Sequence, residues 1–302
     1  MSINNSPLVS IKCTVYNHEP YLRQCLDGFV MQKTNFSFEA IVHDDASTDG
    51  SAAIIREYAE KYPDIIKPIY ETENQYSKKD GSLGRIMNAA IHPDAKYIAI
   101  CEGDDYWIDP NKLQMQYDFM ESHPECGLVC ANYYENGVRA RNSFSYPSDG
   151  KLFDVLMQNN IIGTLTIFFR KDIFDRFKEH LLGKIDRCIY LCFASCSRIY
   201  LIDKCVAVYR VLEESASHSQ SPEKFMRSYD AFTRMTLDTL VYLKTPADKI
   251  RKLFLIPRIK YLLLLASQAG NLQKVRKYSL FLIKNLSFSL RDMYNILFHF
   301  KR

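Results

Sequence analysis

The stretch YIAICEGDDYWIDPNKLQMQ, residues 97–116, changes character twice along its length. YIAICE at 97–102 is an apolar run that predicts a buried β-strand, and KLQMQYDFMES at 112–122 predicts a helix. Acidic residues separate the two segments. A strand that ends in a polar loop and continues into a helix is typical of an α/β fold, in which strands alternate with covering helices.

The loop in this stretch concentrates acidic side chains. Glu102, Asp104 and Asp105 place three carboxylates within four residues. Carboxylates this close repel one another unless a cation or strong hydrogen-bond donors offset their charge. Mg²⁺ or Mn²⁺, which prefer oxygen ligands, suit such a cluster, especially when a diphosphate shares the ion. The alternative is an acidic turn that caps the next helix, but Asp109 before Pro110 can supply that cap, so we favour the metal.

Strand-like and helix-like segments alternate on both sides of this stretch. The strand-like runs are apolar on both faces, which predicts a mostly parallel central sheet covered by helices on both sides. The fold class is therefore α/β. Strands are expected at 8–16, 38–43, 65–71, 97–102 and 126–134, and helices at 21–32, 51–62, 84–91 and 112–122.

Polar clusters follow three of these strands. Tyr16 ends the first, His43 to Asp45 end the second, and Glu102 to Asp105 end the fourth. In open α/β sheets, ligands bind in the crevice outside the carboxyl ends of the strands, so the clusters predict one shared site. The sequence has no glycine-rich phosphate loop of the G-x-G-x-x-G or G-x-x-x-x-G-K type, so dehydrogenase and P-loop functions lose their main support. A metal would then have to neutralise the phosphates of a bound nucleotide.

The second half of the chain is less regular. Strand-like runs at 164–170 and 198–211 enclose helical segments. Helical patterns then continue to the end and are interrupted by Pro246, Pro257 and Gly270. A C-terminal helical extension is therefore expected.

The composition bounds the class of protein. Of the 302 residues, 47% are hydrophobic, so a large buried core is expected. The chain has no run of about 18 apolar residues, and its first residues lack a secretory signal, so we expect a cytoplasmic protein without a membrane-spanning helix. The nine cysteines show no metal-binding spacing and are expected to be reduced thiols.

Four segments together resemble the family 2 glycosyltransferases of bacterial polysaccharide synthesis. They are SIKCTVYNHEPYL, EAIVHDDASTDGS, YIAICEGDDYWIDPNKLQMQ and VAVYRV, and the resemblance spans residues 7–215. It implies a GT-A fold, which is Rossmann-like, with residues 1–135 as the nucleotide-sugar-binding half, 136–217 as the acceptor-binding half and 218–302 as a basic helical extension. It also implies a nucleotide-diphosphate sugar donor, a UDP-sugar first of all, together with a divalent cation and inversion at the anomeric carbon.

The resemblance assigns roles to residues of the predicted site. Tyr16 would stack on the base of the donor, and Asp45 would hydrogen-bond that base. Asp104 and Asp105 would serve the ribose-diphosphate and the metal, which acts as a Lewis acid on the leaving phosphate. Arg210, in the Tyr-Arg pair after the last core strand, would offset the charge of the diphosphate.

An inverting transfer also needs a base that deprotonates the acceptor hydroxyl as it attacks. In the family this base is an aspartate that opens a helix well after the metal motif. Asp186, just ahead of the segment CIYLCFAS, stands at the corresponding place and is the candidate catalytic base. The alternative is that Asp186 is simply the N-cap of this helix.

The resulting hypothesis is a metal-dependent, inverting transfer of a sugar to a glycan or lipid-linked oligosaccharide. Nucleotidyl transfer is a second enzymatic possibility, but it calls for a glycine- and lysine-rich phosphate loop that this sequence lacks. A sugar-nucleotide-binding or scaffold protein without turnover is the third possibility. The presence of the metal-binding acids argues against it.

The C-terminal extension is strongly basic. From Lys249 to Arg302 the chain has twelve Lys or Arg and one acidic residue, Asp292, a net charge of +11 in a chain whose total is +4. Helices that mix apolar clusters with cations bind anionic membrane surfaces, which would place the protein at the inner face of the membrane. A helical bundle packed on the catalytic domain is the alternative. No nucleic acid partner is expected, because residues 1–248 carry −7 and would repel a phosphate backbone.

Overall fold

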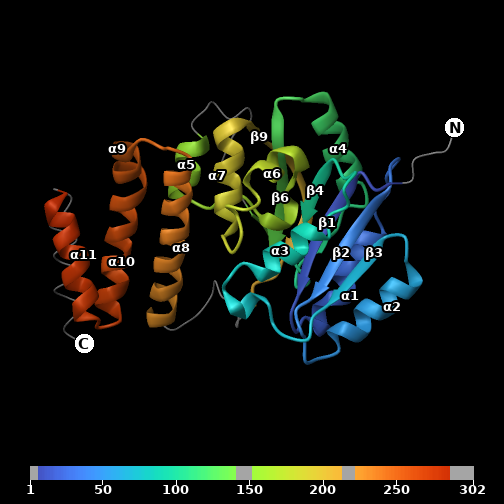
Figure 1. Cartoon of the computed structure of the whole chain (residues 1–302), viewed down its shortest axis with the longest axis horizontal. Coiled ribbons are helices and arrows are strands. Elements are labelled where there is room, and N and C mark those ends of the chain that lie inside the picture. The colour runs from blue at the N-terminus through green and yellow to red at the C-terminus, as the bar shows by residue number, and fades with distance from the viewer. Residues whose placement is uncertain (1–5, 141–151, 213–221, 286–302) are drawn as a thin grey trace. The chain divides into compact units, whose positions relative to one another are not determined.

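The chain forms two compact units (Figure 1). We call residues 1–152 with 161–210 the sheet unit, and residues 153–160 with 211–302 the helical unit. All the site residues named above belong to the sheet unit. The computed structural model describes residues 6–140, 152–212 and 222–285.

The sheet unit is built on one sheet, in which the described residues form nine strands. These are β1 (Val9–Val15), β2 (Phe38–Asp44), β3 (Ile66–Tyr70), β4 (Tyr97–Ile100), β5 (Tyr106–Trp107), β6 (Cys126–Glu135), β7 (Val138–Arg139), β8 (Phe168–Arg170) and β9 (Arg198–Tyr209). Their order is β3-β2-β1-β4-β8-β6-β9-β5, with β7 paired to β6. The first four run parallel, and β8 lies antiparallel between β4 and β6. The longest pairings are parallel, and the α/β class is confirmed. The sheet as a whole is mixed, because β5, β7 and β8 pair antiparallel with their neighbours.

The N-terminal half follows the predicted alternation closely. β2 is buried at every position, as expected for a parallel strand covered on both faces. The apolar face of the first helix packs Leu22, Leu26 and Phe29 into the core beneath the strands. Pro20 lies in the first turn of that helix, where its missing N–H costs no hydrogen bond. The helices are α1 (Glu19–Val30), α2 (Ser51–Lys61), α3 (Ser82–Ala89), α4 (Lys112–Ser122), α6 (Lys171–Phe177) and α7 (Asp186–Cys196).

The segment 164–170, predicted as one strand, divides into two elements. Thr164–Thr166 forms the short 3₁₀ helix η2, and only Phe168–Arg170 joins the sheet as β8. The backbone N–H and the hydroxyl of Thr166 both donate to the Gly163 carbonyl, at 3.0 and 2.7 Å, and close the turn. The carbonyls of the turn accept from side chains of other elements, and these contacts override the local preference for a strand.

The start of α4 also differs from expectation. The helix begins at Lys112 with Asn111 at the N-cap, so Asp109 is not the cap. Asp109 Oδ1 instead accepts from the Asn111 N–H at 3.0 Å, which is an Asx-turn two residues ahead of the helix. Its Oδ2 pairs with Lys204 Nζ at 2.6 Å.

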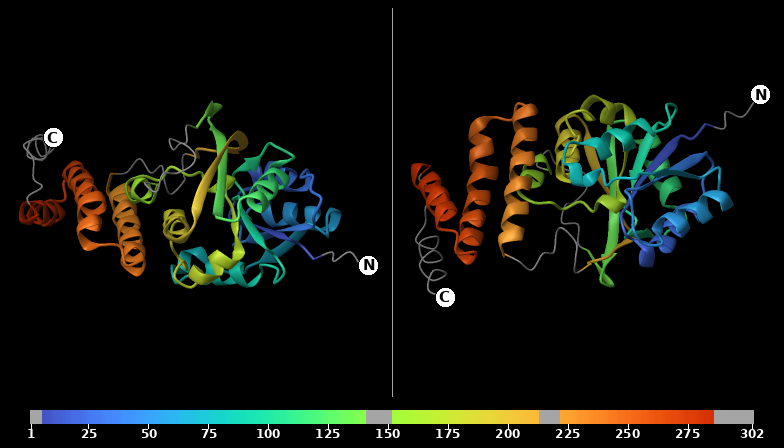
Figure 2. Two further views of the ribbon diagram at one scale, coloured as in Figure 1. Left: turned by 90° about the horizontal axis from the view of Figure 1, so that it is seen from above. Right: turned by 60° about the horizontal axis from the view of Figure 1, so that its bottom comes forward.

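The helical unit contains most of α5 (Leu152–Gln158), which was not predicted, and the C-terminal helices. Three of these, α8, α10 and α11, lie side by side around one apolar cluster (Figure 2). Pro257 was predicted to interrupt a helix, but it lies in the first turn of α10, where the lost N–H is tolerated. Among the described residues, no helix is long and apolar enough to cross a membrane. The C-terminal elements are α8 (Pro222–Tyr242), α9 (Ala247–Lys249), the π-helical turn η3 (Ile250–Leu255), α10 (Ile256–Gln268) and α11 (Leu272–Lys284), and residues 286–302 of the basic segment lie outside the described part.

Candidate active site

The loops after β1, β2 and β4 leave the sheet next to one another, as the sequence predicted. The Asp45 N–H donates to the Val15 carbonyl at 2.8 Å, and the Gly103 N–H donates to the Thr14 carbonyl at 3.0 Å. Both neighbouring loops are therefore bound to the end of β1. Tyr16 follows directly, with 46% of its surface exposed, so its ring is available for stacking.

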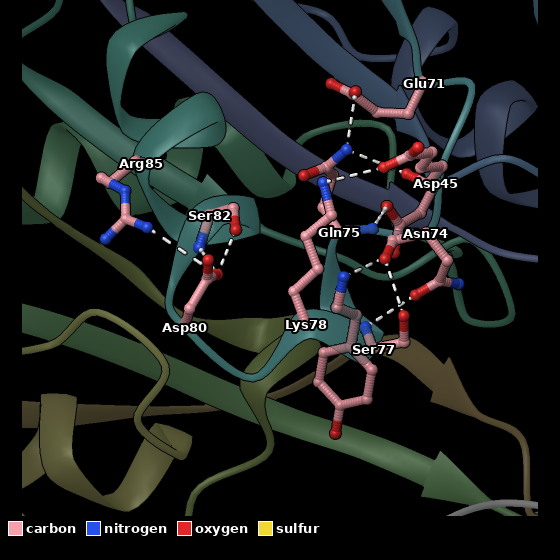
Figure 3. A network of polar contacts seen from close by, with 11 residues as sticks. Asp45, Glu71, Asn74, Gln75, Ser77, Lys78, Asp80, Ser82 and Arg85 are labelled. Carbon is pink, nitrogen blue, oxygen red and sulfur yellow. Dashed lines mark hydrogen bonds and ion pairs between the residues drawn. The ribbon is translucent and has the colours of Figure 1, made fainter.

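Asp45 is nearly fully buried and holds the segment that follows β3 (Figure 3). Its Oδ1 accepts from the Gln75 N–H at 2.6 Å, and its Oδ2 accepts from the Tyr76 N–H at 3.0 Å. The Gln75 side chain in turn donates to Glu71 Oε2 at 3.0 Å. Both oxygens of Asp45 are thus engaged with this segment. The contacts of Asp45 are therefore those of a side chain that holds two loops together, and its predicted hydrogen bond to a base stays a prediction.

Asp104 and Asp105 form one cluster with Arg210, which lies directly after β9. Asp105 Oδ1 accepts from the Arg210 N–H at 2.8 Å, and Arg210 Nη1 donates to the Asp104 carbonyl at 2.5 Å. The guanidinium also lies over the Tyr106 ring, 4.3 Å from its centroid, and contacts the side-chain oxygen of Gln24. Arg210 is therefore fixed against the acidic loop, and its role beside a diphosphate stays a prediction.

The electrostatics of the acidic pair favour a cation. Burial, and then the neighbouring charge of Asp104, raises the pKa of Asp105 to about 8, against the lowering effect of Arg210. In the described part of the chain, no group of three or more His, Cys, Asp or Glu side chains gathers as a metal site. Mg²⁺ sites commonly use only one or two carboxylates and complete their shell with substrate phosphates and water. Asp104 and Asp105 fit that smaller donor set.

Glu102 lies at the start of the same loop. Burial raises the pKa of its carboxyl well above the usual range, and the charge of Asp186 adds to the effect. Burial lowers the pKa of the nearby Lys12 to about 8, while the charge of Glu102 acts the other way. Lys12 Nζ donates to Asn88 Oδ1 at 2.8 Å. The acidic loop and Asp186 are thus within electrostatic range of each other.

Asp186 is the first residue of α7, and the N-cap is Ile185, which makes no side-chain capping bond. The interpretation of Asp186 as a simple N-cap is therefore wrong. Its Oδ2 accepts from the Thr164 hydroxyl at 2.5 Å, and the Tyr190 hydroxyl lies 2.9 Å from Thr164 Oγ1. Burial raises the pKa of Asp186, and the Thr164 hydrogen bond lowers it. A carboxylate held at a raised pKa is suited to accept a proton.

Trp107, which follows the acidic loop in the stretch 97–116, belongs to the core. It is 2% exposed, and its Nε1 donates to the Leu165 carbonyl at 2.8 Å. Its ring packs against Phe29 edge-on, with 5.0 Å between ring centroids. A side chain this buried cannot stack on a sugar, so it acts as a support beneath the loop.

Several residues around the site were not found by sequence reasoning. Gln24 contacts Arg210 from α1, and nothing in the pattern of that helix distinguishes it. Tyr190 follows Asp186 by four residues, a spacing that places both on one helical face and could have indicated the contact. The segment after β3 reads as an ordinary polar linker, although Asp80 accepts from the Ser82 N–H at 2.9 Å and lies 3.7 Å from Arg85 (Figure 3).

The parallel strands and the polar loops at their carboxyl ends match the α/β class that the sequence predicted. The chain belongs to glycosyl transferase family 2, whose family model matches residues 10–199. The family resemblance and the α/β GT-A class read from the sequence are thereby confirmed.

Three individual proteins show the extent of the similarity. An uncharacterized protein of Mycobacterium bovis is 35% identical over 70% of this chain, and the chain spans 61% of that relative's length. TuaG of Bacillus subtilis, a glycosyltransferase assigned to teichuronic acid biosynthesis, is 26% identical over 72% of this chain and 84% of its own length. The mannosyltransferase PcManGT from Pyrobaculum calidifontis has a similar structure, with a TM-score of 0.54 and 18% identity over 98% of this chain and 85% of that one. The last comparison shows the shared fold.

Proposed function

We propose that this chain is an inverting, metal-dependent glycosyltransferase that moves a sugar from a nucleotide-diphosphate sugar to a glycan or lipid-linked oligosaccharide in bacterial surface polysaccharide synthesis. The observation that carries the proposal is the cluster of Asp104, Asp105 and Arg210 on a loop within electrostatic range of Asp186. Cation-holding acids and a base facing one crevice are what such a reaction requires. Family membership and the polysaccharide assignment of TuaG support it.

In the proposed reaction each of these groups has one role. The Asp186 carboxylate takes the proton of the acceptor hydroxyl as that oxygen attacks the anomeric carbon. The new bond forms opposite the diphosphate, the bond from the anomeric carbon to the phosphate oxygen breaks, and the configuration inverts. Arg210 offsets the charge that develops on the leaving diphosphate. Asp104 and Asp105 would hold the divalent cation, whose chemistry is Lewis-acid stabilisation of that leaving group.

The donor would lie with its base against the first two loops. Tyr16 offers an exposed ring for stacking, and Asp45 offers acceptor positions for a base N–H. PcManGT is described in complex with GDP-Man and Mn²⁺, which supports a nucleotide sugar and a divalent cation for this chain as well. A UDP-sugar is the donor that we test first.

Calorimetric titration of the whole chain with UDP, GDP, CDP and dTDP, each with and without Mn²⁺, tests the donor site. We expect one nucleotide to bind with a Kd in the micromolar range, and only with Mn²⁺ present, because two carboxylates repel a diphosphate unless a cation lies between them. A thermal unfolding scan on the same sample verifies that the protein is folded. Folded protein that binds none of the four would contradict the proposal and favour a scaffold.

We also propose that the helical unit binds an anionic membrane surface through one face of α11. This face combines apolar side chains with cations, and α11 contains no acidic residue to pair with them. Exposed apolar residues next to cations are the composition of interfacial helices, and their charge complements an anionic lipid surface. Membrane binding by this face would place the protein at the inner face of the membrane, next to a lipid-linked acceptor. The exposed apolar residues are Leu272, Leu280 and Ile283, and the exposed cations are Arg276, Lys277 and Lys284.

Replacing Arg276, Lys277 and Lys284 together by Gln is expected to lower the affinity for phosphatidylglycerol-containing vesicles on the order of 100-fold, since each near-surface cation contributes about 1 kcal/mol. The affinity is measured by sedimentation with the vesicles. The matched control replaces the exposed Lys33, Lys61 and Lys67 of the sheet unit by Gln, removing the same charge. Equal weakening by the two triple variants would mean that net charge rather than this face binds the membrane.

A further inference from the structure

A chain of three polar side chains leads away from the candidate base. Asp186 Oδ2 accepts from Thr164 Oγ1 at 2.5 Å, and Tyr190 Oη lies 2.9 Å from the same threonine oxygen. Tyr190 is fully buried beside Asp186 on α7, while Thr164 comes from η2 in a different part of the chain. The hydroxyl of Thr164 is therefore the link between the two α7 side chains.

The direction of these hydrogen bonds follows from counting protons. A threonine hydroxyl has one hydrogen, and in this arrangement Thr164 gives it to the carboxylate. Tyr190 must then be the donor to Thr164 Oγ1, since that oxygen has no further hydrogen to give. With Asp186 ionised, the chain runs in one direction, from Tyr190 through Thr164 to Asp186.

Two side chains of the stretch 97–116 fix the position of Thr164 by binding the carbonyls of the two residues that follow it. Trp107 Nε1 donates to the Leu165 carbonyl, and Gln116 Nε2 donates to the Thr166 carbonyl, both at 2.8 Å. Gln116 is itself held by the buried Lys112, whose Nζ donates to Gln116 Oε1 at 2.7 Å. The Lys112 ammonium also lies 4.0 Å from the centroid of the Trp107 ring. The turn that presents Thr164 thus rests on side chains of β5 and α4.

The backbone just before Thr164 is equally constrained. A Cβ added at Gly163 would come 2.4 Å from Cε1 of the Tyr133 ring, so the turn packs directly against β6 at a distance that only glycine allows. Thr164 therefore has little freedom to move away from Asp186.

We propose that Thr164 is the positioning residue for Asp186: its hydroxyl, oriented by Tyr190, holds carboxylate Oδ2 and leaves Oδ1 to receive the proton of the acceptor. This inference rests on the proposed role of Asp186 as the base. Burial raises the pKa of Asp186, and the Thr164 bond, because it is donated to the charged form, lowers that pKa. Burial, and then the charge of Asp186, raises the pKa of Glu102 from the acidic loop and of Tyr190 from α7, and neither of these two groups carries a positive charge.

The direct test is a titration of the Asp186 carboxyl by NMR on the whole chain labelled with [¹³C]aspartate at the side-chain carboxyl, with Asp186→Asn used to assign the resonance. Thr164→Val keeps the shape of the side chain and removes the donor, and we expect the pKa of Asp186 to rise by about 1, the effect of one hydrogen bond to a charged group. Thr164→Ser retains the hydroxyl, and the wild-type pKa is expected to return. An unchanged pKa in Thr164→Val would overturn the proposal.

Tyr190→Phe gives a second, independent measurement. It leaves Thr164 in place and removes only the hydroxyl that orients it, so a smaller rise in the pKa of Asp186 is expected. If Thr164→Val does not fold, this variant decides, and an unchanged pKa in Tyr190→Phe then overturns the proposal.

The pH dependence of turnover separates this inference from the role of Asp186 itself. Asp186 acts as a base only when ionised, so activity falls as the pH drops through its pKa, and Thr164→Val is expected to move that acid limb to higher pH. Release of nucleoside diphosphate from a sugar donor that carries the nucleotide found by calorimetry supplies the assay. Full activity in Asp186→Asn would refute the catalytic base, whereas an inactive Asp186→Asn with a wild-type acid limb in Thr164→Val would refute only the positioning role.

Discussion

Asp186→Asn is expected to lower kcat for sugar transfer by about 10²–10⁴-fold, the contribution typical of a general base. The amide keeps the size of the side chain and its place in the first turn of α7, but it cannot take a proton from the acceptor hydroxyl. Donor binding should be nearly unchanged, because the nucleotide contacts proposed here lie on the loops after β1, β2 and β4. The measurement is release of nucleoside diphosphate under saturating donor, together with a calorimetric Kd for the same nucleotide.

Asp172→Asn is the matched control for this variant. Asp172 is exposed and lies in the first turn of α6, so the substitution removes the same charge from an equivalent helical position. Wild-type turnover in Asp172→Asn and loss of turnover in Asp186→Asn would assign the effect to the site. A kcat for Asp186→Asn within a few-fold of wild type would show that another group takes the proton.

Asp105→Asn is expected to weaken Mn²⁺-dependent nucleotide binding by about 30-fold or more, since removing one partner of a buried charge interaction costs about 2–5 kcal/mol. Asn retains an oxygen that can accept from the Arg210 N–H, so the loop keeps its hydrogen bond and loses only the charge. The ratio of the Kd values measured without and with Mn²⁺ should fall close to one.

Asp175→Asn serves as the comparison for Asp105→Asn. Asp175 lies on α6, pairs with Lys171 and Lys178, and makes no contribution to the acidic loop. The Mn²⁺ dependence of this variant should equal that of wild type. If Asp105→Asn also retains the full Mn²⁺ dependence, the cation is held by other groups and the assignment of the pair is wrong.

The first half of the fold could be predicted from the sequence because its signals are local. The four parallel strands are short apolar runs bounded by polar loops, and β2 is buried at every position, so periodicity and burial agree. The convergence of Tyr16, Asp45 and the acidic loop followed from one topological rule about strand ends. Their chemical roles come from the family resemblance and stay predictions until the variants are measured.

The remaining features depend on contacts between distant segments, which local patterns do not carry. Thr164 and Thr166 favour a strand by propensity, yet they lie in a turn that is held by Trp107 and Gln116. Asp109 precedes a proline in a typical helix-start pattern, but Lys204 from β9 pairs with it and the helix starts later. The hydrogen bonds that the Gln75 and Tyr76 N–H groups donate to Asp45 could not be predicted, because nothing in either segment indicates that the two meet.

The hydrogen bonds from Trp107 and Gln116 to the turn at 164–166 also limit how the protein can be recombined. The segment 107–116 and the turn at 164–166 are far apart in the sequence, yet these two hydrogen bonds join them, so both segments have to come from the same parent protein. A chimera with a crossover between residues 116 and 163 would combine Trp107 and Gln116 of one parent with the turn at 164–166 of the other. A crossover outside residues 107–166 leaves both hydrogen bonds within one parent.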